Sequence, residues 1–154
     1  MRRRDREVTN RAWIDEIVRE AEYMTLALSA PDGSPYAVPV NHVFDGENLY
    51  FHCAKEGLKL DCIKNSPRVA FNTVAQAEYY QNPENRVYTT HYKSVSGWGT
   101  AEILTDTAEK IKALELVRNK FIRGAYTVNE TIADSVCIVK IHVEEIYGKK
   151  NDKM

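Results

Sequence analysis

The residues best suited to bind an anionic ligand lie where a predicted strand ends and a short helix begins. The strand is expected over residues 49–53, and the helix begins at Gly57 or Leu58 and ends near Asn65. The first amides of a helix lack partners and carry partial positive charge, so this position suits a phosphate group. Three cationic side chains accompany the junction: Lys55, Lys59 and Arg68. A solvated basic surface explains the same residues equally well, because no strict glycine fingerprint is present.

A second group of candidates lies in the strand expected over residues 36–44, which contains the run Pro39-Val40-Asn41-His42. Proline cannot donate a hydrogen bond to a sheet ladder, so it marks an edge strand or a bulge. Backbone groups that face no neighbouring strand are free to contact a ligand. Alternation along the strand also allows either Asn41 or His42 to point inward. The alternative is a twisted edge strand that binds nothing.

The third candidate stretch runs from His91 to Gly99 and combines hydroxyl side chains with two glycines. Ser94 and Ser96 could bind a phosphate or the edge of a ring, and Gly97 and Gly99 allow the backbone to approach something flat. A barrel strand that needs glycine in order to bend accounts for the same pattern.

Other kinds of site find little support in the sequence. The cysteines Cys53, Cys62 and Cys137 include no C-x-x-C pair, and their spacing fits no structural zinc site, so we expect no metal centre. Their odd number is unlike a disulfide framework and favours a reducing, cytoplasmic compartment. The G-x-S-x-G motif of hydrolases does not occur.

The composition is that of a globular protein, with 44% hydrophobic and 28% charged residues. A net charge of −1 argues against nucleic acid as a partner, because duplex-binding proteins usually have a strongly basic face. No apolar run approaches the roughly 20 residues of a membrane-spanning helix. We therefore expect one cytoplasmic domain over residues 1–154 that does not bind membranes, with mobile tails at 1–8 and 149–154.

Hydrophobic periodicity predicts short strands joined by hairpin turns, with helices inserted between them. Thr9 or Asn10 caps the first helix, and Asp106 caps a later one with Glu109 as its partner. The stretch from Gln76 to His91 lacks clear periodicity and is interpreted as a loop or lid. The strands are expected over residues 23–29, 36–44, 49–53, 68–75, 94–104 and 136–143. This order favours a mainly-β fold, a small antiparallel barrel with flanking helices, over a doubly wound sheet.

These stretches together resemble a known family over nearly the whole chain. The matching motifs are Met1-Arg2-Arg3-x-Asp5-Arg6-Glu7, Pro35-Tyr36-x-Val38-Pro39-Val40-Asn41, Tyr50-Phe51-His52, Glu56-Gly57-x-Lys59-x-Asp61, Pro67-x-Val69-x-Phe71, Tyr92-x-Ser94-Val95, Gly97-x-Gly99 and the helix carrying Glu109, Lys110, Ala113 and Leu114. The sequence resembles the FMN-binding split-barrel proteins related to pyridoxamine 5'-phosphate oxidase, in particular the branch of nitroimidazole-resistance proteins.

The resemblance implies a six-stranded antiparallel split β-barrel that forms a homodimer, with FMN in the groove between the subunits. By position, the edge at Pro39 with Val40 and Asn41 would lie along the flavin ring. The ring and its side chain would be lined by His52, Cys53 and Ala54. Gly57 and Lys59 would hold the phosphate, and Tyr92, Ser94 and Val95 would lie nearby.

Two departures from the family bear on the activity. The segment Ile146-Tyr147-Gly148-Lys149 lacks the arginine-rich signature with tryptophan that true pyridoxamine phosphate oxidases carry near their C-terminus. Residues 76–86 match nothing in the family and could reshape a substrate pocket.

The leading hypothesis is an FMN-dependent oxidoreductase that reduces small aromatic acceptors such as nitroimidazoles. His52 and His42 are the candidate proton donors, because histidine titrates near neutral pH. For each histidine, the alternative is a ring that packs on the flavin or satisfies a strand hydrogen bond. A non-catalytic FMN-binding module and an oxidase of the vitamin B6 type are the other hypotheses.

Overall fold

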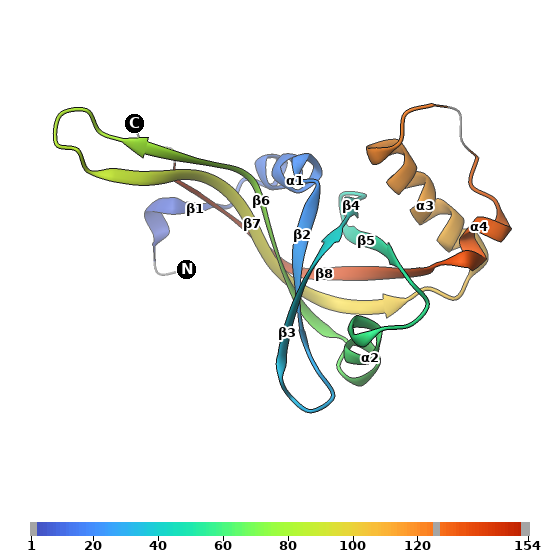
Figure 1. Ribbon diagram of the computed structural model, residues 1–154. Helices are drawn as coiled ribbons and strands as arrows, with labels where there is room; N and C mark the ends of the chain where they lie inside the picture. Colours follow the sequence, from blue (N-terminus) through green and yellow to red (C-terminus); the bar gives the residue numbers. More distant parts are fainter. Residues whose placement is uncertain (1–2, 125–126, 152–154) are drawn as a thin grey trace.

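An antiparallel sheet of eight strands accounts for most of the chain (Figure 1). The structure is a computed structural model, which describes residues 3–124 and 127–151. The strands are β1 (Glu7–Val8), β2 (Tyr23–Ser29), β3 (Pro35–Asn41), β4 (Val43–Phe44), β5 (Asn48–Cys53), β6 (Arg68–Gln81), β7 (Tyr88–Ile103) and β8 (Cys137–Asn151). They pair in the order β3-β2-β6-β7-β8-β5-β4, and β1 pairs with β8. The predicted mainly-β fold is confirmed.

Four α-helices flank the sheet in the part of the chain that the structure describes. They are α1 (Arg11–Glu20), α2 (Leu58–Asn65), α3 (Thr107–Phe121) and α4 (Glu130–Ser135), and a 3-10 helix, η1, spans Arg4–Arg6. The Asn10 side chain accepts a hydrogen bond from the Trp13 amide, and Asp106 accepts one from the Glu109 amide, each at 2.9 Å. Both predicted caps are therefore confirmed. None of the described helices is long and apolar enough to cross a membrane.

Helices α1 and α2 pack against one face of the sheet, and α3 and α4 pack against the other face at β5 and the start of β8. Buried and exposed residues alternate along β2, as expected for a strand with one face against the core. The core on that face includes Ile14, Ile17, Val18, Leu26, Phe71 and Val95. A second cluster joins α3 and α4 to β5. On the opposite face of the sheet, Thr25 and Asn72 remain exposed, so a broad surface of β2, β6, β7 and β8 lies open.

The sheet curls but does not close over the residues described. The end strands β3 and β4 do not pair with each other, although β3 approaches β5. The expected count of six strands is too low by two. The two-residue strand β1 was not expected, and the strand predicted over residues 36–44 divides at His42 into β3 and β4.

The prediction of a loop or lid between Gln76 and His91 is wrong. Strands β6 and β7 continue as a hairpin whose last pair is Gln81 with Tyr88, and this arm extends well away from the helices (Figure 1). Because most side chains near the tip are exposed on both faces, the sequence there shows no alternation of polar and apolar residues. The register shift between Val74 and Gln76 marks the start of the arm.

Strand pairing extends into both segments that were predicted as tails. Glu7 and Val8 of the predicted N-terminal tail pair with Lys149 and Gly148, and β8 continues to Asn151 instead of ending near residue 143. Glycine is required at position 148, because an added Cβ would lie 2.5 Å from the Trp13 ring. Residues 1–2 and 152–154 of the two predicted tails lie outside the described residues.

Candidate functional site

The junction between β5 and α2 has the features of an anion site. Gly57, at φ 136°, occupies a backbone conformation that favours glycine, and its carbonyl accepts the Leu60 amide at 2.9 Å. Within residues 3–124 and 127–151, no side chain caps α2, whereas Asn10, Asp106 and Asn129 cap α1, α3 and α4. The first amides of α2 are therefore left for solvent or a ligand.

Lys59 is the cation best placed to complete this site. It is partly buried in the first turn of α2, close enough to Cys53 for its charge to act on that thiol. No ion pair of Lys59 occurs among residues 3–124 and 127–151, and Lys55 is exposed. The alternative cation, Arg68, instead pairs with Glu144 on the open face of the sheet.

The edge position predicted for Pro39 is confirmed. Among the described strands, β3 pairs with β2 alone, and Pro39 lies opposite Thr25. Every second residue of an edge strand directs its N–H and C=O groups away from its neighbour, so part of this backbone is free to contact a ligand. Val40 is buried, while the side-chain amide of Asn41 donates a hydrogen bond to the Glu22 carbonyl at 3.0 Å.

The two candidate histidines lie in opposite environments. His42 is 1% exposed, and its Nε2 lies 2.8 Å from the Val18 carbonyl oxygen. Burial, together with the nearby charge of Lys120, lowers the pKa of His42 to about 4. His42 thus satisfies a hydrogen bond inside the core, one of the alternatives considered for it. His52, near the end of β5, is exposed to solvent and is the histidine that a ligand at the junction can reach.

The residues from β7 lie far from the junction within one chain. Cys53 pairs with Cys137 of β8, and Ile103 of β7 pairs with Val139, two residues further along β8. The junction therefore lies near the Ile103 end of β7. Ser94 precedes Ile103 by nine residues of the same strand, which at 3.3 Å per residue places it roughly 30 Å away. Tyr92 and Ser94 therefore cannot join His52 and Lys59 in a single chain. The Val95 side chain is fully buried, so only its backbone could meet a ligand.

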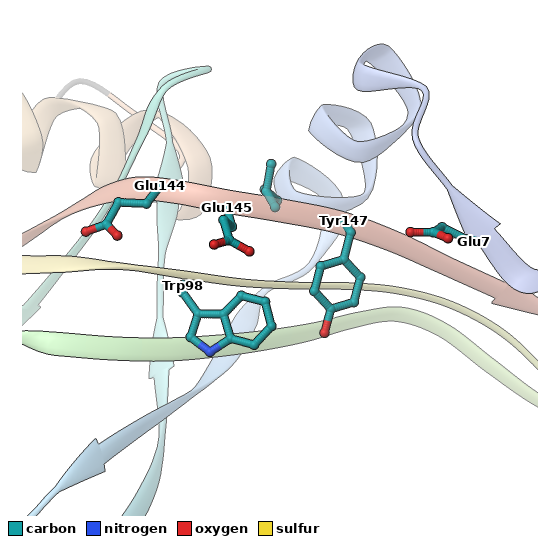
Figure 2. A pocket seen from close by; sticks show the side chains of 6 residues that line it. Glu7, Trp98, Glu144, Glu145 and Tyr147 are labelled. Carbon is teal, nitrogen blue, oxygen red and sulfur yellow. The ribbon is translucent and has the colours of Figure 1, made fainter. Parts of the chain in front are cut away.

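The open face of the sheet holds a feature that the sequence analysis missed. Figure 2 shows Trp98 and Tyr147 on the same side of the sheet, and their ring centroids are 5.7 Å apart. A hollow of about 670 Å³ beside them is lined by Glu7, Trp98, Glu144, Glu145, Ile146 and Tyr147. Three carboxylates make this hollow unsuited to a phosphate. The sequence did contain a signal for this feature. Trp98 stands between Gly97 and Gly99, and alternation along a strand puts its large ring on the face opposite to the two glycines.

Gly97 and Gly99 serve the packing of the sheet, as the alternative interpretation of the sequence proposed. A Cβ on either residue would lie 2.3 Å from a carbonyl oxygen of β8, that of Glu145 or His142. A Cβ on Gly97 would also collide with the Phe71 ring. These glycines allow neighbouring strands and core side chains to approach closely. No cluster of metal-ligating side chains occurs among the described residues.

A family model described as pyridoxamine 5'-phosphate oxidase matches residues 10–150. The chain belongs to this family. Its fold matches that of a candidate 5-nitroimidazole antibiotic resistance protein from Bacteroides thetaiotaomicron, with a TM-score of 0.84 and 21% identity, covering 93% of this chain and 85% of that one. No curated protein sequence matches the chain.

Two further solved structures have similar folds. The flavocytochrome Anf3 from Azotobacter vinelandii has a TM-score of 0.85 at 15% identity, covering 99% of this chain and 72% of that one. An FAD and heme binding protein from Mycobacterium smegmatis has a TM-score of 0.83 at 19% identity, covering 96% and 74%. At such identities these similarities establish the shared fold.

The buried state of His42 predicts a pH dependence of stability. Its pKa is about 4 when folded and near 6.5 when unfolded, so the unfolded chain binds the proton first as the pH falls. The free energy of unfolding should therefore decrease between pH 6.5 and 4, by about 3 kcal/mol from this group. Urea titrations across this range, on wild type and His42→Gln, measure the difference.

The exposed histidine provides the matched control. His52→Gln should keep the full pH dependence, whereas His42→Gln should show a flatter profile. Equal slopes for the wild type and His42→Gln would contradict the assignment of a neutral, buried His42.

Proposed function

We propose that the protein is an FMN-dependent oxidoreductase that reduces small aromatic acceptors such as nitroimidazoles. The observation that carries this proposal is the uncapped N-terminus of α2 beside Lys59, in a chain of the pyridoxamine 5'-phosphate oxidase family. One cationic side chain and one helix N-terminus match a single terminal phosphate, which favours FMN over a dinucleotide. The solved structures with this fold include a protein named for binding FAD and heme and another named as an F420 reductase.

Different residues near the junction would bind different parts of FMN. Lys59 and the first amides of α2 would hold the phosphate, with Gly57 providing the turn that exposes those amides. His52, Cys53 and Ala54 would line the ring and its side chain. The free edge of β3, from Pro39 to Asn41, would offer backbone groups to the flavin ring.

The remaining part of the site comes from a second copy of the chain. Tyr92, Ser94 and Val95 lie roughly 30 Å from the junction in their own subunit, so they reach the flavin only from a partner. A two-fold pair, the commonest arrangement for soluble oligomers, places each β7 beside the other junction. The open face of the sheet, where Trp98 is 37% exposed, is the surface available for such packing.

FMN would supply the redox chemistry when bound. The contribution of the chain is to orient the ring, leave one side open to a flat acceptor, and deliver protons. His52 is the proton donor in this proposal, since it is exposed at the junction. His42 has no such role, because its imidazole is buried and neutral at physiological pH.

The activity can be tested with reduced holoprotein. The protein is loaded with FMN, reduced anaerobically with dithionite, and mixed with a nitroimidazole while flavin absorbance is followed. Reoxidation should be faster than for free reduced FMN, because the bound ring is held open to the acceptor. Binding of FMN with no acceleration toward several nitroaromatics would instead identify a flavin-binding module, and no binding would overturn the proposal.

Replacing Lys59 by alanine tests the phosphate site. Hydrogen bonds to charged groups contribute about 1.5 to 3 kcal/mol, so FMN affinity should fall by about 10- to 100-fold. Riboflavin, which lacks the phosphate, should bind Lys59→Ala and wild type almost equally. Lys55→Ala is the matched control and should retain FMN affinity. Fluorescence titration gives all of these dissociation constants, and an unchanged FMN affinity in Lys59→Ala would contradict this assignment.

Complementation between subunits tests the shared site. Lys59→Ala and Ser94→Glu should each weaken FMN binding in their own homodimers. After subunit exchange, a mixed dimer contains one site built from the unchanged junction of one chain and the unchanged β7 of the other. Tight FMN sites should therefore reappear in the mixture, with a molecular mass of twice one chain by light scattering. Absence of recovery, or a holoprotein of single-chain mass, would show that the site does not span two subunits.

A further inference from the structure

Two cysteines lie directly opposite each other at the end of the sheet nearest α2. Cys53 is the last residue of β5, Cys137 is the first residue of β8, and the two are paired in antiparallel register. Partner residues in such a pair direct their side chains to the same face of the sheet. Cys137 is close enough to act on the Cys53 thiol, and both side chains are partly buried. Cys62, by contrast, is completely buried within α2.

The backbone geometry at this position fits a disulfide. Paired residues of antiparallel strands have Cα atoms about 4.5 or 5.5 Å apart, depending on the hydrogen-bonding pattern. Disulfides span Cα separations of about 4.4 to 6.8 Å, so both values are compatible. The Cβ separation needs to shorten only slightly, and rotation about the Cα–Cβ bonds brings the sulfurs together. A bond between Cys53 and Cys137 therefore requires no rearrangement of the sheet.

We propose that Cys53 and Cys137 form a reversible disulfide within one chain, and that low-molecular-weight disulfides such as glutathione disulfide oxidise the pair. One cysteine thiolate attacks a sulfur of the oxidant, which forms a mixed disulfide and releases one thiolate. The second cysteine then attacks the sulfur of the first, which releases the other half of the oxidant. Two electrons pass from the cysteines to the oxidant, and the two protons of the cysteines end on the two released thiols.

The position of the pair gives the reaction a structural consequence. Cys53 is followed by the exposed segment 54–57 that leads to α2, and the charge of Lys59 acts on its thiol. A disulfide would fix the end of β5, and with it the start of this segment, to the first residue of β8. It forms independently of the proposed flavin site, but would alter the surroundings of Lys59.

The surroundings of Cys53 also set the speed of the reaction. Burial raises the pKa of Cys53 to about 11, the adjacent Cys137 adds to this effect, and Lys59 opposes it. Because the thiolate is the attacking form, oxidation should be slow near neutral pH and faster in alkaline buffer.

Thiol counting on the full chain tests the proposal. The purified protein is treated with glutathione disulfide, quenched in acid, denatured, alkylated and analysed by peptide mass spectrometry. Labelling of both Cys53 and Cys137 should be lost together, with an intact mass lower by two hydrogen atoms and labelling restored by dithiothreitol. Cys62, which is buried and unpaired with either, should be labelled equally before and after oxidation and serves as the internal control.

Single substitutions separate an intramolecular bond from other oxidation products. Cys53→Ser and Cys137→Ser each leave one partner, so they should give only a mixed disulfide with glutathione. The proposal is overturned if wild type also stops at mixed disulfides, if non-reducing electrophoresis shows covalent dimers, or if both thiols stay reduced while the pair is exposed to the oxidant in alkaline buffer.

Discussion

The pairing of β7 with β8 is the constraint on which the rest of the structure depends. The two strands run side by side from Tyr92 to Ile103, and β8 carries β1 and β5 on its other edge. Close contact along this ladder requires glycine at positions 97 and 99, where a Cβ would meet the carbonyl oxygens of β8. The ladder determines where β5 ends, and therefore where the junction with α2 and the Cys53–Cys137 pair lie.

Local chemistry accounts for the elements that the sequence predicted well. Asn10 and Asp106 cap helices because their side chains can accept an amide hydrogen bond, which requires no knowledge of the fold. Pro39 indicates an edge because it lacks an N–H group. The arm formed by β6 and β7 escaped prediction for a related reason: its pairing is held by backbone hydrogen bonds, and its side chains face solvent on both sides.

The histidines show where pattern alone is insufficient. Alternation predicted that either Asn41 or His42 points inward, and the structure places His42 in the core, bound to the Val18 carbonyl. His42 faces the core and not a ligand because α1 and Lys120, which are distant in sequence, pack against it. The pattern within one strand does not contain this information. In the same way, the motif match assigns His52, Lys59 and Ser94 to one binding site. Within a single chain, however, Ser94 on β7 lies roughly 30 Å from the junction.

The distribution of charge determines which end of a ligand binds at the junction. Lys59 and the free amides of α2 attract an anion at the junction, whereas Glu7, Glu144 and Glu145 make the hollow on the open face repel one. The positive charge of Arg68 offsets little of this repulsion, because its guanidinium is already paired with Glu144. Beside the carboxylates, Trp98 and Tyr147 present aromatic surface. A ligand with one anionic end and one flat aromatic end would therefore bind in a single orientation, its phosphate at α2. In the proposed dimer, the sheet surfaces of the two copies are then left to meet its ring.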